Sequence, residues 1–318
     1  MKKKIILFMF TILLVFSVIG CSTIKGNNGF SKESDGEPRL KIVVTTFTAY
    51  DFVRQISGDN VELTYLLAPG VDSHSYTPTE EDYVTINNAD IFIYVGGEME
   101  SWVDDSSDAI ILPENKMYSM MDFVELKDGD VTPDEHVWTS PANALMIIDE
   151  ITTIICNNDE YDSDFYKENL KSLTANIKVL RADMTKIENE SVRKKLVFGD
   201  KMPMQYFLDE FGLTASALFD RCSTETEPDE SMIANLVNVV NAEHIPVVLY
   251  IELSDGSVAK TIAEETGTTA MQIQTLHNVS EEDFENGETY TSLMTRNFEV
   301  LQAALGLKSE FEKKPIKE

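Results

Sequence analysis

Residues 166–187, YKENLKSLTANIKVLRADMTKI, carry the most regular pattern in the chain. Apolar side chains recur there at alternating spacings of four and three residues: Tyr166, Leu170, Leu173, Ile177, Leu180, Met184 and Ile187. Because an α-helix has about 3.6 residues per turn, this spacing places all of these side chains on one face of a helix. The run covers only about three heptads, which is short for a coiled coil. We therefore predict one long connecting helix within residues 161–194.

Strand and helix patterns alternate before this segment. Three β-branched or apolar runs predict strands: Lys41–Phe47, Val61–Leu67 and Ile91–Val95. Helical patterns lie between and after these runs: Tyr50–Ile56, Thr79–Asn87 and Pro141–Ile155. Alternation of this kind predicts a mainly parallel sheet, whose ligands bind beyond the carboxyl ends of the strands. We expect residues 39–160 to form an N-terminal α/β lobe.

The chain after the predicted long helix repeats this alternation. Its predicted strands are Leu196–Phe198, Pro246–Ile251 and Ala270–Leu276. Its predicted helices are Pro203–Phe211, Glu230–Ala242, Ser257–Thr266 and Tyr290–Leu305. We expect a C-terminal α/β lobe over residues 195–310, followed by a tail over residues 311–318. The chain exceeds what one small core usually organises, so the predicted fold class is α/β, with two lobes of mainly parallel sheet joined by one long rigid helix.

The amino terminus has the pattern of a signal peptide, predicted over residues 1–20. Three lysines, Lys2–Lys4, precede the apolar run Ile5–Ile19, which is shorter than the roughly 20 residues that a spanning helix needs. The run ends at Val18-Ile19-Gly20-Cys21, which resembles the lipobox of bacterial lipoproteins. We predict that cleavage leaves Cys21 as a lipidated first residue. The alternative is an ordinary secretory signal with an incidental cysteine.

Residues 21–38 are rich in glycine, serine, asparagine, lysine and glutamate, which predicts a flexible linker behind the lipid anchor. A lipidated Cys21 would carry more than one acyl chain, which gives stable membrane anchoring. No later segment is long and apolar enough to span a bilayer. We therefore expect the folded part to be held at the extracytoplasmic face of a bacterial cell membrane.

The charge balance is strongly acidic and limits the partners. The chain has 26 lysines and arginines against 55 acidic residues, a formal charge of −29, which falls to −32 without the lysines of the signal. Binding to phosphates needs a basic surface, so we expect no nucleic acid partner. Apart from Cys21, the cysteines are Cys156 in a predicted helix and Cys222 in a predicted loop. Their separation indicates neither a disulfide framework nor a zinc knuckle, so we expect two unpaired thiols, with a lone bridge as the alternative.

Two of the four histidines lie in near-repeats. Asp72–Thr77 and Asp134–Thr139 both read Asp-x-His-x-aromatic-Thr, and each precedes a predicted helix. Imidazole is the commonest protein ligand for borderline transition metals. The repetition predicts that His74 and His136 are two ligands of one metal site, although either motif alone also fits a histidine of the surface or core. The aspartate two residues before each histidine either orients the imidazole or caps the turn, and the spacing does not choose between these roles.

The order of these motifs resembles one family, the zinc- and manganese-binding substrate-binding lipoproteins of metal ABC importers. The match includes the lipobox, Val71–Pro78, Asn88-Ala89-Asp90, Asp134–Trp138, the long helix and Glu265-Thr266-Gly267. Further matches lie at Tyr206-Phe207, Phe211-Gly212-Leu213, Glu227-Pro228 and Tyr290 through Asn297 to Leu305. The resemblance covers nearly all of the predicted mature chain. It implies two α/β lobes joined by a rigid helix, with the metal in the cleft between the lobes.

The resemblance carries His74 and His136 over as the first two ligands. The third family position falls on Lys201, and a protonated lysine binds no metal. Asp200, at the end of a predicted strand, is the expected substitute, with capping of the next turn or pairing with Lys201 as the alternative. The fourth family position falls near Gln274.

His277, three residues after Gln274, is the expected fourth ligand, with a solvent-facing loop histidine as the alternative. Glu252 follows a predicted strand and is a further candidate, as a ligand, as support for a ligand or as a helix cap. Two glutamates near Cys222, Glu225 and Glu227, are weaker candidates. His244 precedes a strand, at the wrong end for such a crevice, so we expect a structural role for it. We expect two aromatic side chains to wall the pocket: Tyr76 and Trp138.

The expected cargo is Zn²⁺, because a third imidazole favours zinc, whereas harder oxygen ligands would also admit Mn²⁺. The resemblance implies a monomer that captures the ion outside the cytoplasm and delivers it to an ABC permease in the membrane. A secreted zinc metallohydrolase is one alternative, but the chain contains no His-Glu-x-x-His helix and no Gly-x-Ser-x-Gly elbow. We therefore expect no enzyme. An adhesin or metal buffer without a permease is the other alternative.

Overall fold

The fold is built on two four-stranded parallel sheets. The computed structural model describes residues 39–72, 75–106, 108–127, 133–220 and 228–306. The strands of the first sheet are β1 (Lys41–Val44), β2 (Glu62–Tyr65), β3 (Ile91–Tyr94) and β4 (Met117–Ser119), in the order β2-β1-β3-β4. Those of the second are β5 (Lys195–Met202), β6 (Thr214–Asp220), β7 (Val247–Ile251) and β8 (Thr269–Ile273), in the order β6-β5-β7-β8. The two sheets thus share one strand order, and the predicted fold class is confirmed.

Helices connect the parallel strands, as parallel pairing requires. Those before the long helix are α2 (Phe47–Ser57), α3 (Glu80–Asn87), α4 (Ser101–Asp105) and α5 (Pro141–Asn158). Short 3₁₀ turns lie at η1 (Gly58–Asn60), η3 (Glu98–Glu100), η4 (Glu114–Lys116), η5 (Met120–Phe123) and η6 (Val137–Thr139). The later helices are α7 (Gln205–Glu210), α8 (Glu230–Ala242), α9 (Ser257–Thr266), α10 (Glu281–Glu285) and α11 (Tyr290–Leu305).

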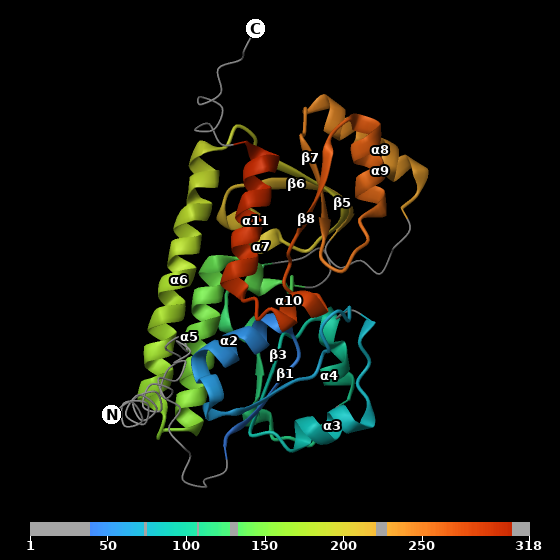
Figure 1. The fold of residues 1–318 in the computed structure, drawn as a ribbon. Coiled ribbons are helices and arrows are strands. Elements are labelled where there is room, and N and C mark those ends of the chain that lie inside the picture. The colour runs from blue at the N-terminus through green and yellow to red at the C-terminus, as the bar shows by residue number, and fades with distance from the viewer. Residues whose placement is uncertain (1–38, 73–74, 107, 128–132, 221–227, 307–318) are drawn as a thin grey trace, which may run out of the picture. The chain divides into compact units, whose positions relative to one another are not determined.

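The predicted connecting helix is α6 (Ser163–Glu190). Every apolar residue of its stripe is buried except Leu170, which is half-buried. The helix packs against α2, α5 and α11, and Figure 1 shows it running beside α5 and then α11. Its stripe belongs to one continuous core that also contains Ile42 and Ile93 of the first sheet and Leu196 and Leu249 of the second. The helix therefore ties both sheets to a shared hydrophobic core.

Local capping explains where several elements begin. The Thr79 hydroxyl accepts from the Asp82 amide while the Asp82 carboxylate accepts from the Thr79 amide, a capping box at the start of α3. The Ser140 hydroxyl accepts from the Asn143 amide, and Pro141 takes the first position of α5. These starts agree with the sequence patterns.

Three predicted strand ends are wrong. The strand predicted to end at Phe198 continues to Met202 with an irregularity between Phe198 and Lys201, so Asp200 lies within β5. The first strand stops at Val44, because the Thr46 side chain accepts from the Ala49 amide and starts α2 at Phe47. The last strand stops at Ile273, and the chain then turns through Leu276, which has a φ of 68°. Two strands that the patterns did not predict, β4 and β6, each occupy an edge of their sheet.

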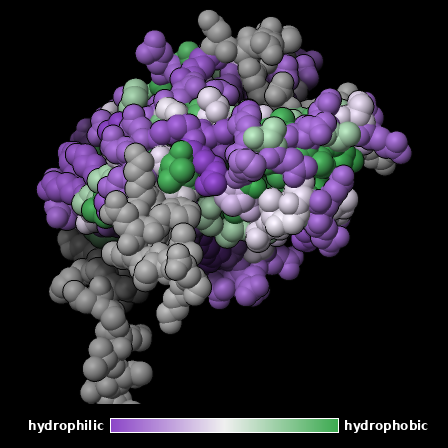
Figure 2. Space-filling view, turned by 90° about the horizontal axis from the view of Figure 1, so that it is seen from above, coloured by the Kyte–Doolittle hydropathy of each residue, from purple (hydrophilic) through white to green (hydrophobic). Residues whose placement is uncertain are grey.

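The surface agrees with the acidic, hydrophilic composition. The face in Figure 2 is mostly hydrophilic, with small separate hydrophobic patches. Within the described residues, no helix combines the length and the apolar character that crossing a membrane requires.

Candidate metal centre

His136 is buried and held by its own motif. The Oδ1 atom of Asp134 accepts from the His136 backbone amide at 3.0 Å and lies 2.6 Å from Nδ1 of the His136 ring. Asp134 therefore does both things that the spacing left open: it closes the turn and it orients the imidazole. Because a carboxylate accepts, Nδ1 carries the proton in the neutral ring, which places the lone pair that could bind a metal on Nε2.

His277 lies in the turn after β8 and is also buried. Its Nδ1 atom is 2.7 Å from the hydroxyl oxygen of Thr275. Its backbone carbonyl accepts from the amide of Phe47, the first residue of α2, at 3.1 Å. The turn after the second sheet is thus bonded to the helix that follows β1.

The two imidazoles lie side by side. Their ring centroids are 4.7 Å apart, with an interplanar angle of 72°. Two imidazoles that share a tetrahedral zinc ion at 2.0–2.1 Å have centroids about 5 Å apart, so this spacing is compatible with one ion between them. Trp138 is centred 5.7 Å from the His136 ring and 5.2 Å from the His277 ring, and its indole N–H donates to the Thr275 carbonyl. Trp138 is therefore a wall of this pair, as the sequence predicts.

Asn278, which is fully buried, bonds the turn after β8 to the segment that follows β2 of the first sheet. Its side-chain amide donates to the carbonyls of Ala68 at 2.7 Å and Val71 at 2.8 Å. Its side-chain oxygen accepts from the Tyr65 hydroxyl at 2.8 Å. These bonds place His277 next to His136, although His277 follows a strand of the other sheet.

His74, with its neighbour Ser73, lies outside the described residues, so its predicted place in the site stays a prediction. Glu225, Glu227 and Cys222 also lie outside them, and so does Cys21. Within the described ranges, no group of three or more histidine, cysteine, aspartate or glutamate side chains is placed to hold a metal ion. Of the predicted ligands, His136 and His277 are the two that the described part of the chain brings together.

Asp200 lies on β5 and is half-buried. Its Oδ1 accepts from the Lys201 amide at 2.8 Å, and its Oδ2 accepts from the Ile251 amide at 3.4 Å. Both bonds hold the backbone at the carboxyl ends of β5 and β7. Because a carboxylate has about four acceptor positions, these two bonds leave capacity for a further partner.

Gln274 is buried, and its backbone exchanges two hydrogen bonds of 2.7 Å with the side chain of Asn297 on α11. Its side-chain oxygen is buried without a hydrogen bond. Glu252 is buried at the end of β7 and accepts from the Thr275 and Leu276 backbone amides at 2.6 and 2.7 Å. Burial raises the pKa of Glu252, and these hydrogen bonds oppose the rise.

Two further carboxylates are buried: Glu135, which precedes His136 in its motif, and Glu100. Glu100 accepts from the Val95 and Gly96 amides at 2.6 and 3.0 Å, and burial raises its pKa to about 7. Glu135 accepts from the Met99 amide at 3.2 Å, and burial raises its pKa as well. The Glu135 side chain lies over Gly97, which has a φ of 74°; a Cβ there would lie 2.4 Å from a Glu135 oxygen. This close approach explains Gly97, whereas a Cβ at Gly96, which has a φ of 96°, would lie 2.8 Å from the Ser119 hydroxyl oxygen.

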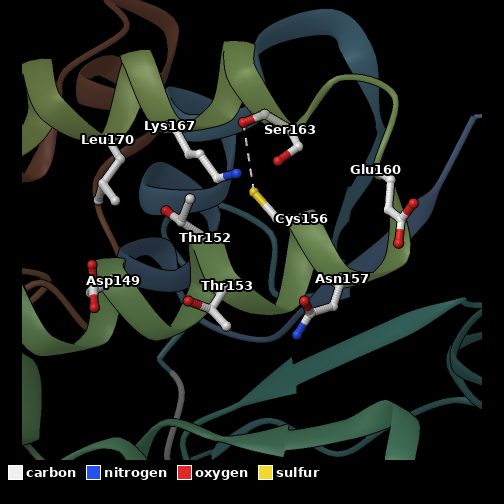
Figure 3. A pocket seen from close by; sticks show the side chains of 9 residues that line it. All are labelled: Asp149, Thr152, Thr153, Cys156, Asn157, Glu160, Ser163, Lys167 and Leu170. Carbon is white, nitrogen blue, oxygen red and sulfur yellow. Dashed lines mark hydrogen bonds between the residues drawn. The ribbon is translucent and has the colours of Figure 1, made fainter.

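A separate hollow of about 420 Å³ lies between α5 and α6 (Figure 3). Its walls include Thr152, Cys156, Asn157 and Lys167, and the Cys156 thiol donates to the Ser163 carbonyl at 3.8 Å. Each residue advances a helix by about 1.5 Å, so Cys156 is roughly 20 Å along α5 from its first residue, which follows the His136 motif. No histidine lines this hollow, and it is not part of the metal centre.

The remaining candidates have structural surroundings. Tyr76 packs edge-on against Trp102, with ring centroids 6.0 Å apart. His244 is exposed just after α8 and has a φ of 52°. Thr275 and Asn278 were missed by the sequence analysis. One signal was present: Thr275 precedes His277 by two residues, as Asp134 precedes His136.

Comparisons with known proteins agree with this geometry. The family model described as zinc-uptake complex component A, periplasmic, matches residues 42–304. The high-affinity zinc uptake system protein ZnuA of Bacillus subtilis is 27% identical over 93% of this chain and 95% of that protein. The zinc-binding lipoprotein AdcA of Streptococcus pneumoniae is 25% identical over 94% of this chain, which spans only 60% of AdcA.

Solved structures show the same fold. The metal-dependent lipoprotein YcdH of Bacillus subtilis superposes with a TM-score of 0.75 at 26% identity, over 84% of this chain and 99% of that one. The Zn(II)-bound ZnuA-like domain of Streptococcus pneumoniae AdcA superposes with a TM-score of 0.74 at 25% identity, with the same coverage. The chain therefore belongs to the zinc-uptake complex component A family, and is the substrate-binding component of a zinc-uptake ABC system rather than an enzyme.

Proposed function

We propose that the protein captures Zn²⁺ outside the cytoplasm with His74, His136 and His277, and that Asp200, which does not form one group with the two described histidines in this structure, supplies the fourth ligand. The observation that carries this proposal is the edge-to-face pair of His136 and His277, each with its Nδ1 atom engaged. Nε2 of each ring then binds the ion, and the third histidine comes from the repeated motif at Asp72–Thr77.

Zinc is favoured over manganese by the ligand types. Three neutral imidazoles and one carboxylate match the nitrogen-rich tetrahedral sites of zinc, whereas manganese prefers oxygen ligands. Zinc is bound by the AdcA domain whose fold this chain shares. The buried surroundings of both described histidines keep water from competing for the ion.

Delivery to an ABC permease is the second part of the proposal. The lipid anchor at Cys21 would hold the protein at the extracytoplasmic face of the membrane, next to its permease. Two of the relatives are lipoproteins by name, which supports this location. Transport of zinc into proteoliposomes that contain the permease should then require the metal-loaded protein, and transport that is equally fast without it would contradict delivery.

Titration of the purified protein with Zn²⁺ and Mn²⁺ tests the capture step. We expect His74→Ala, His136→Ala and His277→Ala each to weaken zinc binding at least about tenfold, because each removes one bond to the ion. Asp200→Ala should weaken it less, because its carboxylate is partly used by backbone amides.

His244→Asn is the matched control. His244 is exposed and has a positive φ, which asparagine tolerates, so this variant should bind zinc like the wild type. Unchanged affinity in either His74→Ala or His136→Ala would remove the basis of the proposal. Tighter binding of manganese than of zinc would contradict the choice of cargo.

A further inference from the structure

Glu252 holds the turn that carries His277. It follows β7, and both of its carboxylate oxygens accept hydrogen bonds from the turn after β8. One oxygen accepts from the Thr275 amide at 2.6 Å. The other accepts from the Leu276 amide at 2.7 Å and from the Thr275 hydroxyl at 2.6 Å. None of these three bonds joins Glu252 directly to an imidazole.

The Thr275 hydroxyl joins this carboxylate to His277. Its oxygen lies 2.6 Å from Glu252 Oε1 and 2.7 Å from His277 Nδ1. A hydroxyl has one proton to donate. The backbone N–H groups of Thr275 and Leu276 favour the carboxylate form of Glu252 against the effect of burial, and a carboxylate can only accept the proton of the hydroxyl. The hydroxyl proton is thus used in the bond to Glu252, and the bond between Thr275 and His277 needs a proton from the imidazole. Nδ1 of His277 therefore carries the proton, and the Thr275 oxygen accepts it.

We propose that Glu252 is a positioning residue that acts through the Thr275 hydroxyl to hold His277 in the tautomer with its lone pair on Nε2. This inference rests on the proposed function, because it assigns a role toward the zinc that His277 would bind. Asp134 has the same effect on His136 by direct contact. The two imidazoles are thus set in the same tautomer by two devices, a direct carboxylate and a carboxylate that acts through a hydroxyl.

The backbone geometry of the turn supports this positioning role of Glu252. Leu276 has a φ of 68°, a backbone conformation that a branched side chain rarely adopts, and its amide is bonded to Glu252. Thr275, Glu252 and His277 are all buried, so water does not replace any of the three bonds. A role confined to bracing the turn would need the two backbone amides alone, whereas the hydroxyl bond adds contact with the imidazole.

Variants of Thr275 separate the two roles. Thr275→Val removes the hydroxyl and keeps the shape and the backbone bonds to Glu252, while Thr275→Ser keeps the hydroxyl. We expect Thr275→Val to weaken zinc binding about 10–100-fold, as measured by competition with a chelator, and Thr275→Ser to bind close to the wild type. Nitrogen-15 NMR of the metal-free protein should show the Nδ1–H tautomer of His277 in the wild type and in Thr275→Ser, and a shift toward Nε2–H in Thr275→Val.

Glu252→Gln provides a second readout. A carboxamide cannot accept on both sides, so its NH2 group opposes one backbone N–H in either orientation. In place of Oε2 it opposes the Thr275 N–H, and in place of Oε1 it opposes the Leu276 N–H, donates to the Thr275 hydroxyl and reverses the chain of bonds. We expect weaker zinc binding in either case, and the shift toward Nε2–H of His277 in the second. An unchanged His277 tautomer and affinity in folded Thr275→Val would overturn the inference. So would equal losses in Thr275→Val and Thr275→Ser. Failure of the proposed function is a different result: His277→Ala would bind zinc like the wild type.

Discussion

The imidazole rings of His136 and His277 lie 4.7 Å apart, although each follows a strand of a different sheet. His136 is placed by its own aspartate, whereas His277 is placed by bonds from its turn to Phe47, Ala68 and Val71. The turn of His277 is also bonded to Glu252, which follows β7 of the second sheet. The pair is therefore held by contacts from both sheets.

Asp134→Asn should weaken zinc binding about 10–100-fold while the protein remains folded. The carboxylate raises the basicity of the His136 ring and fixes its tautomer, and an amide does both less well. Chelator competition measures the affinity. Asp229→Asn is a suitable control, because Asp229 caps α8 through the Met232 amide and lies outside the site. Equal affinities of the wild type and Asp134→Asn would show that this orientation has no effect on binding.

Glu100 should make stability depend on pH. Burial raises its pKa from 4.5 to about 7, so the folded protein holds this proton more tightly than the unfolded chain does. Its contribution to stability is fully present below the ordinary pKa and is lost as the pH rises through about 7. Relative to Glu100→Gln, the wild-type free energy of unfolding should fall by roughly 3 kcal/mol between pH 4.5 and pH 8.

The glutamine keeps an oxygen for the Val95 and Gly96 amides and cannot ionise, which makes Glu100→Gln a close match. Urea unfolding at several pH values measures the difference. Glu81→Gln, at an exposed position on α3, should show little change with pH. Parallel pH profiles of the wild type and Glu100→Gln would refute the assignment.

Asp51→Asn should destabilise the fold by about 3 kcal/mol, because the buried carboxylate accepts from several donors, among them half-buried Arg54, and a carboxamide cannot accept from all of them. Asp51 is fully buried on α2 and accepts from Arg54 at 2.8 Å, from Gln55 at 2.7 Å and from the Tyr290 amide at the start of α11 at 2.6 Å. Thermal and urea unfolding measure the loss. Glu168→Gln, which removes an exposed pair with Lys171, should unfold almost like the wild type. A similar stability of both variants would mean that the Asp51 bonds contribute little.

Asn278→Ala should loosen the turn that carries His277. It removes the two bonds to the Ala68 and Val71 carbonyls, with an expected cost of about 2–3 kcal/mol. The Phe47 amide donates to the His277 carbonyl, so its hydrogen exchange should become faster, and zinc binding should weaken. Asn189→Ala, on an exposed part of α6, is the control. Unchanged exchange at Phe47 would show that Asn278 does not hold the turn.

Much of the fold follows from local patterns. The ranges of α8, α9 and α11 agree with the predicted helices, and the stripe from Tyr166 to Ile187 predicted α6. Helical periodicity and capping depend on residues three or four positions apart, so a sequence displays them directly. The strands β4 and β6 were missed because β4 has only three residues and β6 has a single β-branched residue, Thr214, so neither shows the run that marks a strand.

The sequence by itself determined the two α/β halves, the long helix and the repeated motif that marks His74 and His136. Only the tertiary structure decided that His277 meets His136, that Asp134 both closes its turn and orients its ring, and that Glu252 reaches His277 through Thr275. The physical reason is that these contacts join loops at the ends of strands that are distant in the chain. Their geometry depends on how both sheets and α6 share one core and on the hydrogen bonds from the turn after β8 to residues beside the first sheet. Neither has a local signature in the sequence.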